Sequence, residues 1–215
     1  MGGLKIMNLK NTYVVIAALA LSLGLCGHNK TSEAFAKEST TSPYLQVAGN
    51  WVEKPVAPEI NPSGDIPDSQ VFVKYTSLRG GYELDVPEGW ARRTRGGDVL
   101  FTSKLGGLSV TVTDAGKMPD AQSVRKNQAR QLEKTGRAVV IKSVKGMKIK
   151  NGPVVRIVYE SNSEPNPVTN KQVRLEDDMY FYYRDGKVAE LRLWAPLGAD
   201  NVDQWNRISE SFKWR

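Results

Sequence analysis

The pattern of apolar and polar positions in residues 71–215 is that of short β-strands separated by turns. In residues 82–86 (YELDV) apolar and polar side chains alternate, which is the period of a strand with one buried face. Asp185-Gly186 is a turn dipeptide between two such runs and predicts a β-hairpin, and Gly106-Gly107 marks the loop of a second hairpin. The same pattern predicts strands at residues 71–75, 82–86, 99–102, 108–112, 138–145, 147–150, 154–160, 179–183 and 188–194.

Two segments repeat apolar side chains at helical intervals instead. Residues 121–135 form the first, with Asp120 placed as the N-cap and Gly136 as the helix stop. Residues 201–212 form the second and carry a single apolar stripe. Hairpins that follow one another, together with two widely separated helices, predict an α+β domain in which an antiparallel β-sheet is flanked by helices.

The beginning of the chain has the pattern of an export signal. Lys5 and Lys10 precede residues 13–25, an uncharged apolar run of 13 residues. A membrane-spanning helix needs roughly 20 such residues, whereas a run of about 10–14 is typical of a signal-peptide core. We therefore predict a signal peptide over residues 1–26, with residue 36 as its alternative end.

The site at which this signal would be cleaved has two main interpretations. Residues 23–26 (LGLC) resemble a bacterial lipobox, in which Cys26 becomes the lipid-attached first residue of a membrane-anchored lipoprotein. Ala34-Phe35-Ala36 resembles an ordinary signal-peptidase site, and cleavage after Ala36 would release a secreted protein. An uncleaved anchor is a third possibility. Each interpretation places the body of the protein outside the cytoplasm, and a lipid anchor on Cys26 would hold it at the membrane.

Residues 27–70 have the composition of a linker rich in Pro, Ser and Thr. Five prolines interrupt this segment, and proline disrupts both helices and central strands. The predicted organisation is therefore a signal peptide, a linker over residues 27–70 and one globular domain over residues 71–215.

The single Cys and the single His exclude several classes of site. Cys26 and His28 both precede the predicted domain. The domain therefore has no disulfide framework, no Cys- or His-based zinc site, no iron–sulfur cluster and no His-based catalytic triad. We predict no catalytic residue, no metal site and no cofactor, and we expect a protein without enzymatic activity.

The net charge is positive but modest. It is +7 for the whole chain and +5 without residues 1–26, which contain two Lys and no acidic residue. No nucleic-acid-binding module is recognisable, so we expect no nucleic acid as a partner. The sharpest basic cluster is Arg92, Arg93 and Arg95. We expect a solvated turn here, and the alternative is a basic patch that contacts an anion or a protein partner.

Glu176, Asp177 and Asp178 form the densest acidic group. Consecutive residues on a strand point to opposite faces, so the three carboxylates cannot easily converge on one ion. We expect a solvated strand end here, with a divalent-cation site as the alternative.

Residues 161–171 form a long polar loop and are the candidate contact with a protein partner. Loops of this length in a compact domain are often binding elements, although a disordered crossover is the alternative. The candidate partner-binding residues are Glu164, Pro165, Asn166, Pro167, Asn170 and Lys171.

Several motifs, in their order along the chain, resemble PsbP-like domains. Residues 81–90 (GYELDVPEGW) resemble the opening strand and turn of that family, and residues 182–187 (YYRDGK) resemble its hairpin. Residues 194–196 (WAP), 201–205 (NVDQW) and 211–214 (SFKW) resemble its closing helix. The resemblance spans roughly residues 75–215.

The resemblance implies an α/β/α sandwich in an exported or membrane-associated protein without enzymatic activity. We therefore expect a bacterial cell-envelope protein that acts as a binding or accessory module for a membrane-associated protein partner. The alternative is an extracytoplasmic protein that binds a small molecule or a divalent ion in a pocket between sheet and helix. The oligomeric state is left open by the sequence.

Overall fold

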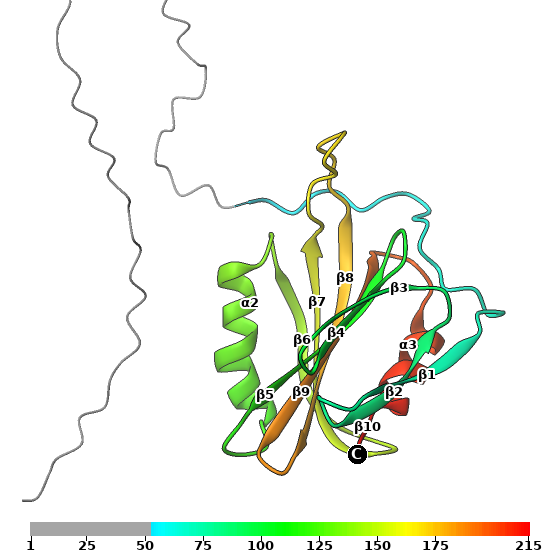
Figure 1. The fold of residues 1–215 in the computed structure, drawn as a ribbon. Helices are drawn as coiled ribbons and strands as arrows, with labels where there is room; N and C mark the ends of the chain where they lie inside the picture. Colours follow the sequence, from blue (N-terminus) through cyan, green and yellow to red (C-terminus); the bar gives the residue numbers. More distant parts are fainter. Residues whose placement is uncertain (1–52) are drawn as a thin grey trace, which may run out of the picture. The chain divides into compact units, whose positions relative to one another are not determined.

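The computed structural model describes residues 53–215, which fold into two antiparallel sheets and two helical segments (Figure 1). The larger sheet has the strand order β3-β4-β5-β9-β8-β7-β6, and the smaller has the order β1-β2-β10. The strands are β1 (Phe72–Ser77), β2 (Tyr82–Pro87), β3 (Ala91–Arg95), β4 (Asp98–Thr102), β5 (Gly107–Asp114), β6 (Val140–Ile149), β7 (Gly152–Asn162), β8 (Arg174–Arg184), β9 (Lys187–Pro196) and β10 (Lys213–Trp214).

The large sheet is built mainly from hairpins, as the sequence predicts. The β8–β9 hairpin turns at Asp185-Gly186, where both residues have positive φ angles of 47° and 79°. These angles suit the tight turn that matches the twist of two antiparallel strands. The β4–β5 hairpin turns before Gly107, which confirms the second predicted loop.

One face of the large sheet is covered by a continuous helical segment. It consists of α1 (Ala121–Val124), a π-helical turn (Arg125–Ala129) and α2 (Arg130–Thr135), which confirms the helix predicted over residues 121–135. Asp120 closes a capping box, accepting a bond from the backbone N–H of Ser123 at 2.8 Å. Val124 and Ala129 pack with Ile157 and Phe181 of the sheet.

The opposite face carries the small sheet and α3 (Val202–Ser211). Tyr82 of β2, Tyr182 of β8 and Phe212 at the end of α3 stack on one another, with ring centroids 5.5 Å and 4.1 Å apart. The large sheet thus has a hydrophobic cluster on each face. Side chains alternate along β8, so Tyr182 packs in the cluster beneath α3 whereas Phe181 packs in the cluster beneath the helical segment 121–135. The fold is thus mostly antiparallel β-sheet, and the predicted flanking by helices is met in part.

Besides the short strand β10, which the pattern does not predict, the strands differ from the predicted ones mainly at three places. Residues 92–95 lie in strand β3 and not in a solvated turn, because they pair with β4. β6 is one continuous strand with a bulge after Ile141, where two shorter strands are predicted. β8 begins at Arg174, five residues before the predicted start, because Asp177 and Asp178 are part of the sheet.

Residues 53–71 lie along the surface of the domain. Ile66 is buried in the core between the sheets, and its backbone N–H donates to Asn201 Oδ1 at 2.6 Å. The backbone N–H of Val56 donates to Asn162 Oδ1 at 3.1 Å. The predicted signal peptide, Cys26 and residues 27–52 of the predicted linker lie outside the described residues. Within residues 53–215, no helix is both long and apolar enough to cross a membrane.

Candidate functional site

The acidic run of Glu176, Asp177 and Asp178 lies in the body of β8. Asp177 is 0% exposed, Asp178 is 1% exposed and Glu176 is half-buried. The expectation of a solvated strand end is therefore wrong. The predicted alternation is confirmed, because Asp177 bonds to Arg192 on one face while Glu176 and Asp178 line a cavity against α3 on the other.

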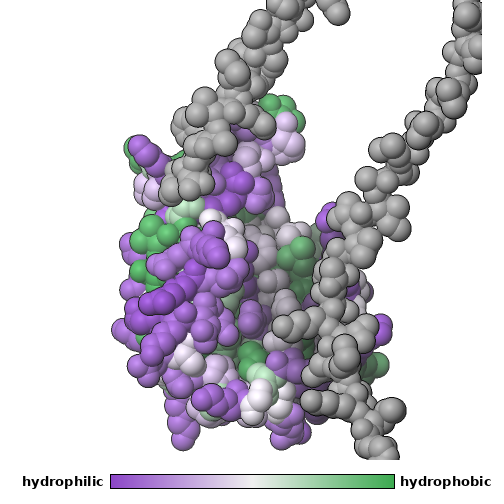
Figure 2. All heavy atoms as spheres, turned by 90° about the vertical axis from the view of Figure 1, so that its left-hand side faces the viewer, coloured by the Kyte–Doolittle hydropathy of each residue, from purple (hydrophilic) through white to green (hydrophobic). Residues whose placement is uncertain are grey.

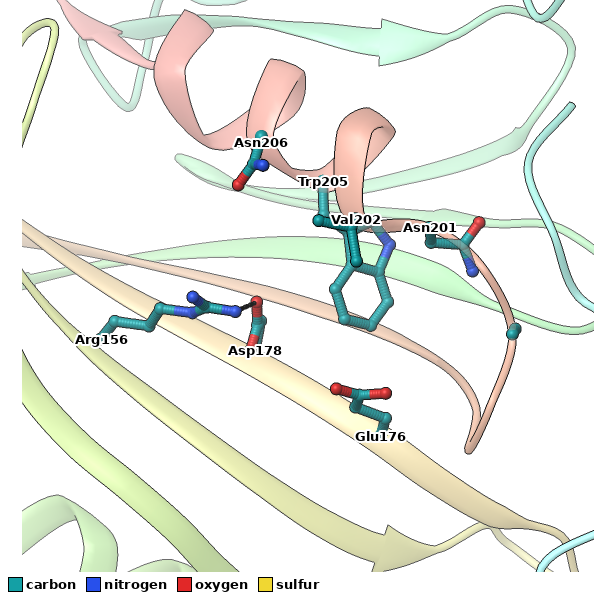
Figure 3. Close-up of a pocket in the computed structure, with 8 residues that line it drawn as sticks. Arg156, Glu176, Asp178, Asn201, Val202, Trp205 and Asn206 are labelled. Atoms are coloured by element: carbon teal, nitrogen blue, oxygen red, sulfur yellow. Dashed lines mark hydrogen bonds and ion pairs between the residues drawn. The ribbon is translucent and has the colours of Figure 1, made fainter. Parts of the chain in front are cut away.

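This cavity, which we call the α3 cavity, has a volume of about 180 Å³ and lies between the large sheet and the start of α3. Figure 3 shows the two carboxylates rising from β8, Arg156 reaching in from β7, and the indole of Trp205 pointing from α3 toward Glu176 with its edge. The cavity is lined by Arg156, Glu176, Asp178, Ala199, Asn201, Val202, Trp205 and Asn206.

Asp178 is the most deeply buried carboxylate of the α3 cavity. Its Oδ2 accepts bonds from the Arg156 guanidinium and from the Tyr180 hydroxyl, the latter at 3.2 Å. Burial raises the pKa of Asp178, and Arg156 opposes that rise by stabilising the charged form. Burial likewise raises the pKa of Tyr180, to about 12, so this phenol stays protonated and donates.

Glu176 is the carboxylate of the α3 cavity that has no hydrogen-bond donor among the described residues. Burial raises its pKa, and the negative charge of Asp178 raises it further. The protein thus holds one paired and one unpaired carboxylate side by side in a half-enclosed space.

Asp177 forms a separate ion pair on the helix face. Its Oδ1 accepts from Arg192 Nε at 2.8 Å and from Nη2 at 2.6 Å, and its Oδ2 accepts from Ser161 Oγ at 2.6 Å. The Arg192 guanidinium also lies over the Trp194 ring, 4.9 Å from its centroid. Burial raises the pKa of Asp177, and Arg192 opposes the rise. Both carboxylate oxygens are satisfied, so this pair ties β8 to its neighbouring strands.

The candidate partner-binding loop protrudes between β7 and β8 (Figure 1). It joins neighbouring antiparallel strands, so it is a hairpin loop and not a crossover. Asn166 Oδ1 accepts from the backbone N–H groups of Val168 and Thr169, at 2.9 and 3.0 Å, which orders the tip. Pro165, Pro167, Asn170 and Lys171 complete this tip, and Val168 at its apex is 89% exposed.

The base of the loop joins the end of α2. Glu164 accepts from Arg137 at 3.3 Å, and Arg137 also pairs with Glu53 at 3.3 Å. The loop and the helix therefore belong to one continuous surface.

Arg92, Arg93 and Arg95 are all exposed on the edge strand β3. The Arg92 guanidinium lies over the Tyr75 ring, 5.9 Å from its centroid. Arg93 and Arg95 line a shallow hollow with β4 and β5. Because side chains alternate along the strand, the three arginines do not converge on one point.

A larger basic surface lies on the helical segment and the edge strand β6. Residues 115–151 contain ten Lys and Arg and two Asp and Glu, a net charge of +8 against +7 for the whole chain. Figure 2 shows the side of the domain on which α2 lies, and it is predominantly hydrophilic. We call this surface the basic face. Its exposed cations are Arg125, Lys126, Arg130 and Lys134 on the helical segment and Lys142, Lys145, Lys148 and Lys150 on or next to β6. The side chains of β6 alternate between the two faces of the sheet, and Lys142 pairs with Glu160 at 2.7 Å.

Sequence inspection misses the basic face because its cations are spread over a helix and a strand. Lys126, Arg130 and Lys134 stand four residues apart and thus form one stripe on the helix. A charge count over a window of about 35 residues, without a motif, is the signal that finds it.

No candidate metal centre is found in the described part of the chain, where no three His, Cys, Asp or Glu side chains come together. Two carboxylates face the α3 cavity, and Arg156 already neutralises one of them. This arrangement does not suit a divalent cation, which needs six to eight oxygen ligands in the case of Ca²⁺.

Comparison with solved structures shows the fold to be PsbP-like. The cyanobacterial PsbP protein (CyanoP) of Synechocystis is similar with a TM-score of 0.50 at 16% sequence identity, over 71% of this chain and 99% of that one. A Bacteroides thetaiotaomicron protein matches with a TM-score of 0.42 at 12% identity, over 66% of this chain and 48% of that one. A Pseudomonas aeruginosa protein of unknown function matches with a TM-score of 0.42 at 16% identity, over 67% and 97%.

The structural similarity to CyanoP confirms, at the level of the fold, the resemblance that the sequence motifs indicate. The sequence matches no family model and no curated protein.

Proposed function

We propose that this protein is a non-catalytic module of the cell envelope that binds a membrane-associated protein partner. The observation that supports this function best is the concentration of positive charge on the basic face. Charge gathered on one surface attracts and orients a partner of opposite charge. The proposed partner therefore presents an acidic surface.

The partner-binding loop supplies the second part of the proposed contact surface. It carries an exposed apolar side chain, Val168, between prolines and polar residues, and its base is linked to the end of α2 through Arg137 and Glu164. In such an interface the charged surface increases the rate of association, and the buried apolar side chain decreases the rate of dissociation.

The proposed location follows from the beginning of the sequence. Export by a signal peptide over residues 1–26, with lipid attachment at Cys26, would place the domain at the outer side of a membrane. Release after Ala36 would instead give a secreted protein. The intact mass of the mature chain separates a lipidated Cys26 from a free Lys37 terminus.

Two variants test the contact surface. The first reverses the helical stripe, with Lys126→Glu, Arg130→Glu and Lys134→Glu. The second replaces residues 165–171 by Asn-Gly, a two-residue turn that keeps the hairpin and the Arg137–Glu164 pair. The matched control for the first variant reverses the charge of three exposed lysines elsewhere on the domain, with Lys104→Glu, Lys187→Glu and Lys213→Glu.

The readout is recovery of membrane proteins from solubilised envelopes of the native host by each tagged variant. We expect at least one membrane protein to be bound by the wild-type chain and by the control, and to be lost with both contact-surface variants. Recovery of the same proteins by all four chains would reject the proposed surface.

A second candidate function, small-molecule binding, is favoured by the α3 cavity. The cavity is half-enclosed and polar, and it holds Asp178, whose Oδ1 has no partner among the described residues. Native mass spectrometry of protein purified from its own host would show a retained ligand as a defined added mass. Loss of that mass in the Trp205→Ala variant would place the ligand in the α3 cavity.

A further inference from the structure

The α3 cavity contains a buried acceptor that no group of the described residues satisfies. Asp178 is 1% exposed, and its Oδ1 has no hydrogen-bond donor, although Oδ2 accepts from Arg156 and Tyr180. A carboxylate oxygen buried without a donor is costly, so the contents of the cavity are expected to supply one.

The second carboxylate of the α3 cavity, Glu176, also lacks a hydrogen-bond donor in the described part of the chain. Glu176 is half-buried beside Asp178, and no described group donates to it. Ionised carboxylates only accept hydrogen bonds, so both side chains favour a ligand with several N–H or O–H donors. The buried Nε of Arg156 is a donor of the same cavity that also has no partner among the described residues.

The charges of the cavity favour a cation. Two carboxylates and one guanidinium face it, which leaves one negative charge without a counter-ion. Asn201, Asn206 and Val202, which line the α3 side, are uncharged, so no second cation of this wall balances Glu176.

The indole of Trp205 adds an aromatic wall on the side facing Glu176 (Figure 3). An apolar wall suits the carbon chain of an organic cation, and the attraction between an ammonium group and carboxylates strengthens when water is excluded. A divalent metal ion fits less well, because Arg156 already pairs with Asp178 and too few oxygen ligands remain among the described residues to coordinate the metal. An organic cation is therefore the better fit.

We propose that the α3 cavity binds a small primary alkylammonium compound, whose ammonium group donates to Glu176 and to Asp178 Oδ1 while its carbon chain packs on Trp205 and Val202. This proposal rests on the second candidate function and gives the chemical class of its ligand.

Calorimetric titration of the full chain with butylammonium chloride tests the proposal. Tetramethylammonium, which has no N–H donor, and 1-butanol, which has no charge, serve as comparison compounds. The matched variants are Glu176→Gln and Glu190→Gln. Glu190 is also a partly buried carboxylate with a pKa raised by burial, but it pairs with Phe181 and lies on the helix face of the sheet.

We expect saturable binding of one butylammonium per chain with a Kd on the order of 1 mM or tighter. Glu176→Gln should weaken it about tenfold, because a hydrogen bond to a charged group is lost, whereas Glu190→Gln should leave it unchanged. Both comparison compounds should bind at least tenfold more weakly. The Trp205 indole N–H resonance should shift along the same titration.

Three results would overturn the proposal. They are the absence of saturation up to about 10 mM butylammonium, equal binding of 1-butanol, and equal affinity of the Glu176→Gln and Glu190→Gln variants. The first would mean that water alone occupies the cavity. A retained native ligand of another chemical class, found by mass spectrometry, would reject the alkylammonium assignment while leaving small-molecule binding intact.

Discussion

Replacing Asp177 by alanine tests the buried ion pair that joins β8 to its neighbouring strands. The change removes an acceptor that is 0% exposed and receives three hydrogen bonds, two from Arg192 and one from Ser161. Arg192 is then left without its counter-ion, and the Ser161 hydroxyl without its acceptor. Removing one partner of a fully buried pair destabilises a protein by roughly 3–5 kcal/mol.

The expected effect is smaller here because the Arg192 side chain is 36% exposed and lines a cavity that water can enter. We therefore expect a loss of about 2–3 kcal/mol in the free energy of unfolding. For a domain of this size this corresponds to a decrease in Tm of roughly 4–12 °C. Urea denaturation followed by circular dichroism measures the free energy directly.

Two further variants make the result specific. Glu164→Ala breaks an ion pair whose carboxylate is 82% exposed, and it should cost less than about 1 kcal/mol. The double variant Asp177→Leu with Arg192→Met should recover at least half of the loss, because no buried charge is left unpaired. A loss below about 1 kcal/mol for Asp177→Ala, or no recovery in the double variant, would refute the reasoning.

Two other predictions concern titration and core packing. The folded-state pKa of Glu176 is raised above its ordinary value of 4.5, so its contribution to stability is present below pH 4.5 and is lost as the pH rises. The stability of Glu176→Gln relative to wild type should therefore increase between pH 4 and pH 7 in urea titrations, and a constant difference would contradict this sign. Phe212 is 1% exposed and stacks on Tyr182 at 4.1 Å, so Phe212→Ala should cost about 3–5 kcal/mol in the same assay. A cost below about 1 kcal/mol would show that this stack does not hold α3 to the sheet.

Local sequence signals predict the hairpins and the helices well. Asp185-Gly186 specifies a tight turn by itself, and Asp120 caps the helix through an interaction with a residue three positions away. Both depend on residues close in sequence, so the pattern along the chain is sufficient to find them.

The acidic run of β8 could not be predicted in this way. Three charged residues in succession are typical of a solvated segment, and their burial depends on Arg156 in β7 and Arg192 in β9, which contact them only after the sheet forms. The sequence contains one signal: Arg156 interrupts the apolar run of residues 154–159, and Arg192 lies between Leu191 and Leu193. A charge in such a position indicates a buried partner on a neighbouring strand.

The PsbP-like fold was predictable because its motifs occur in order over most of the domain, whereas the candidate sites were not. The basic face depends on a helix lying beside an edge strand, and the α3 cavity depends on residues from β7, β8 and α3 meeting in space. Such sets have no fixed spacing in the sequence, so the structure is needed to find them.

The proposed contact surface is tested most directly by photo-crosslinking in the native host. A benzophenone amino acid is introduced singly at position 168 in the loop, at position 130 in the basic face, and at position 104 as an exposed control. We predict that positions 168 and 130 form an adduct with the same membrane protein and that position 104 does not. The absence of any adduct at positions 168 and 130, or equal adducts at all three positions, would contradict the proposed role of this surface.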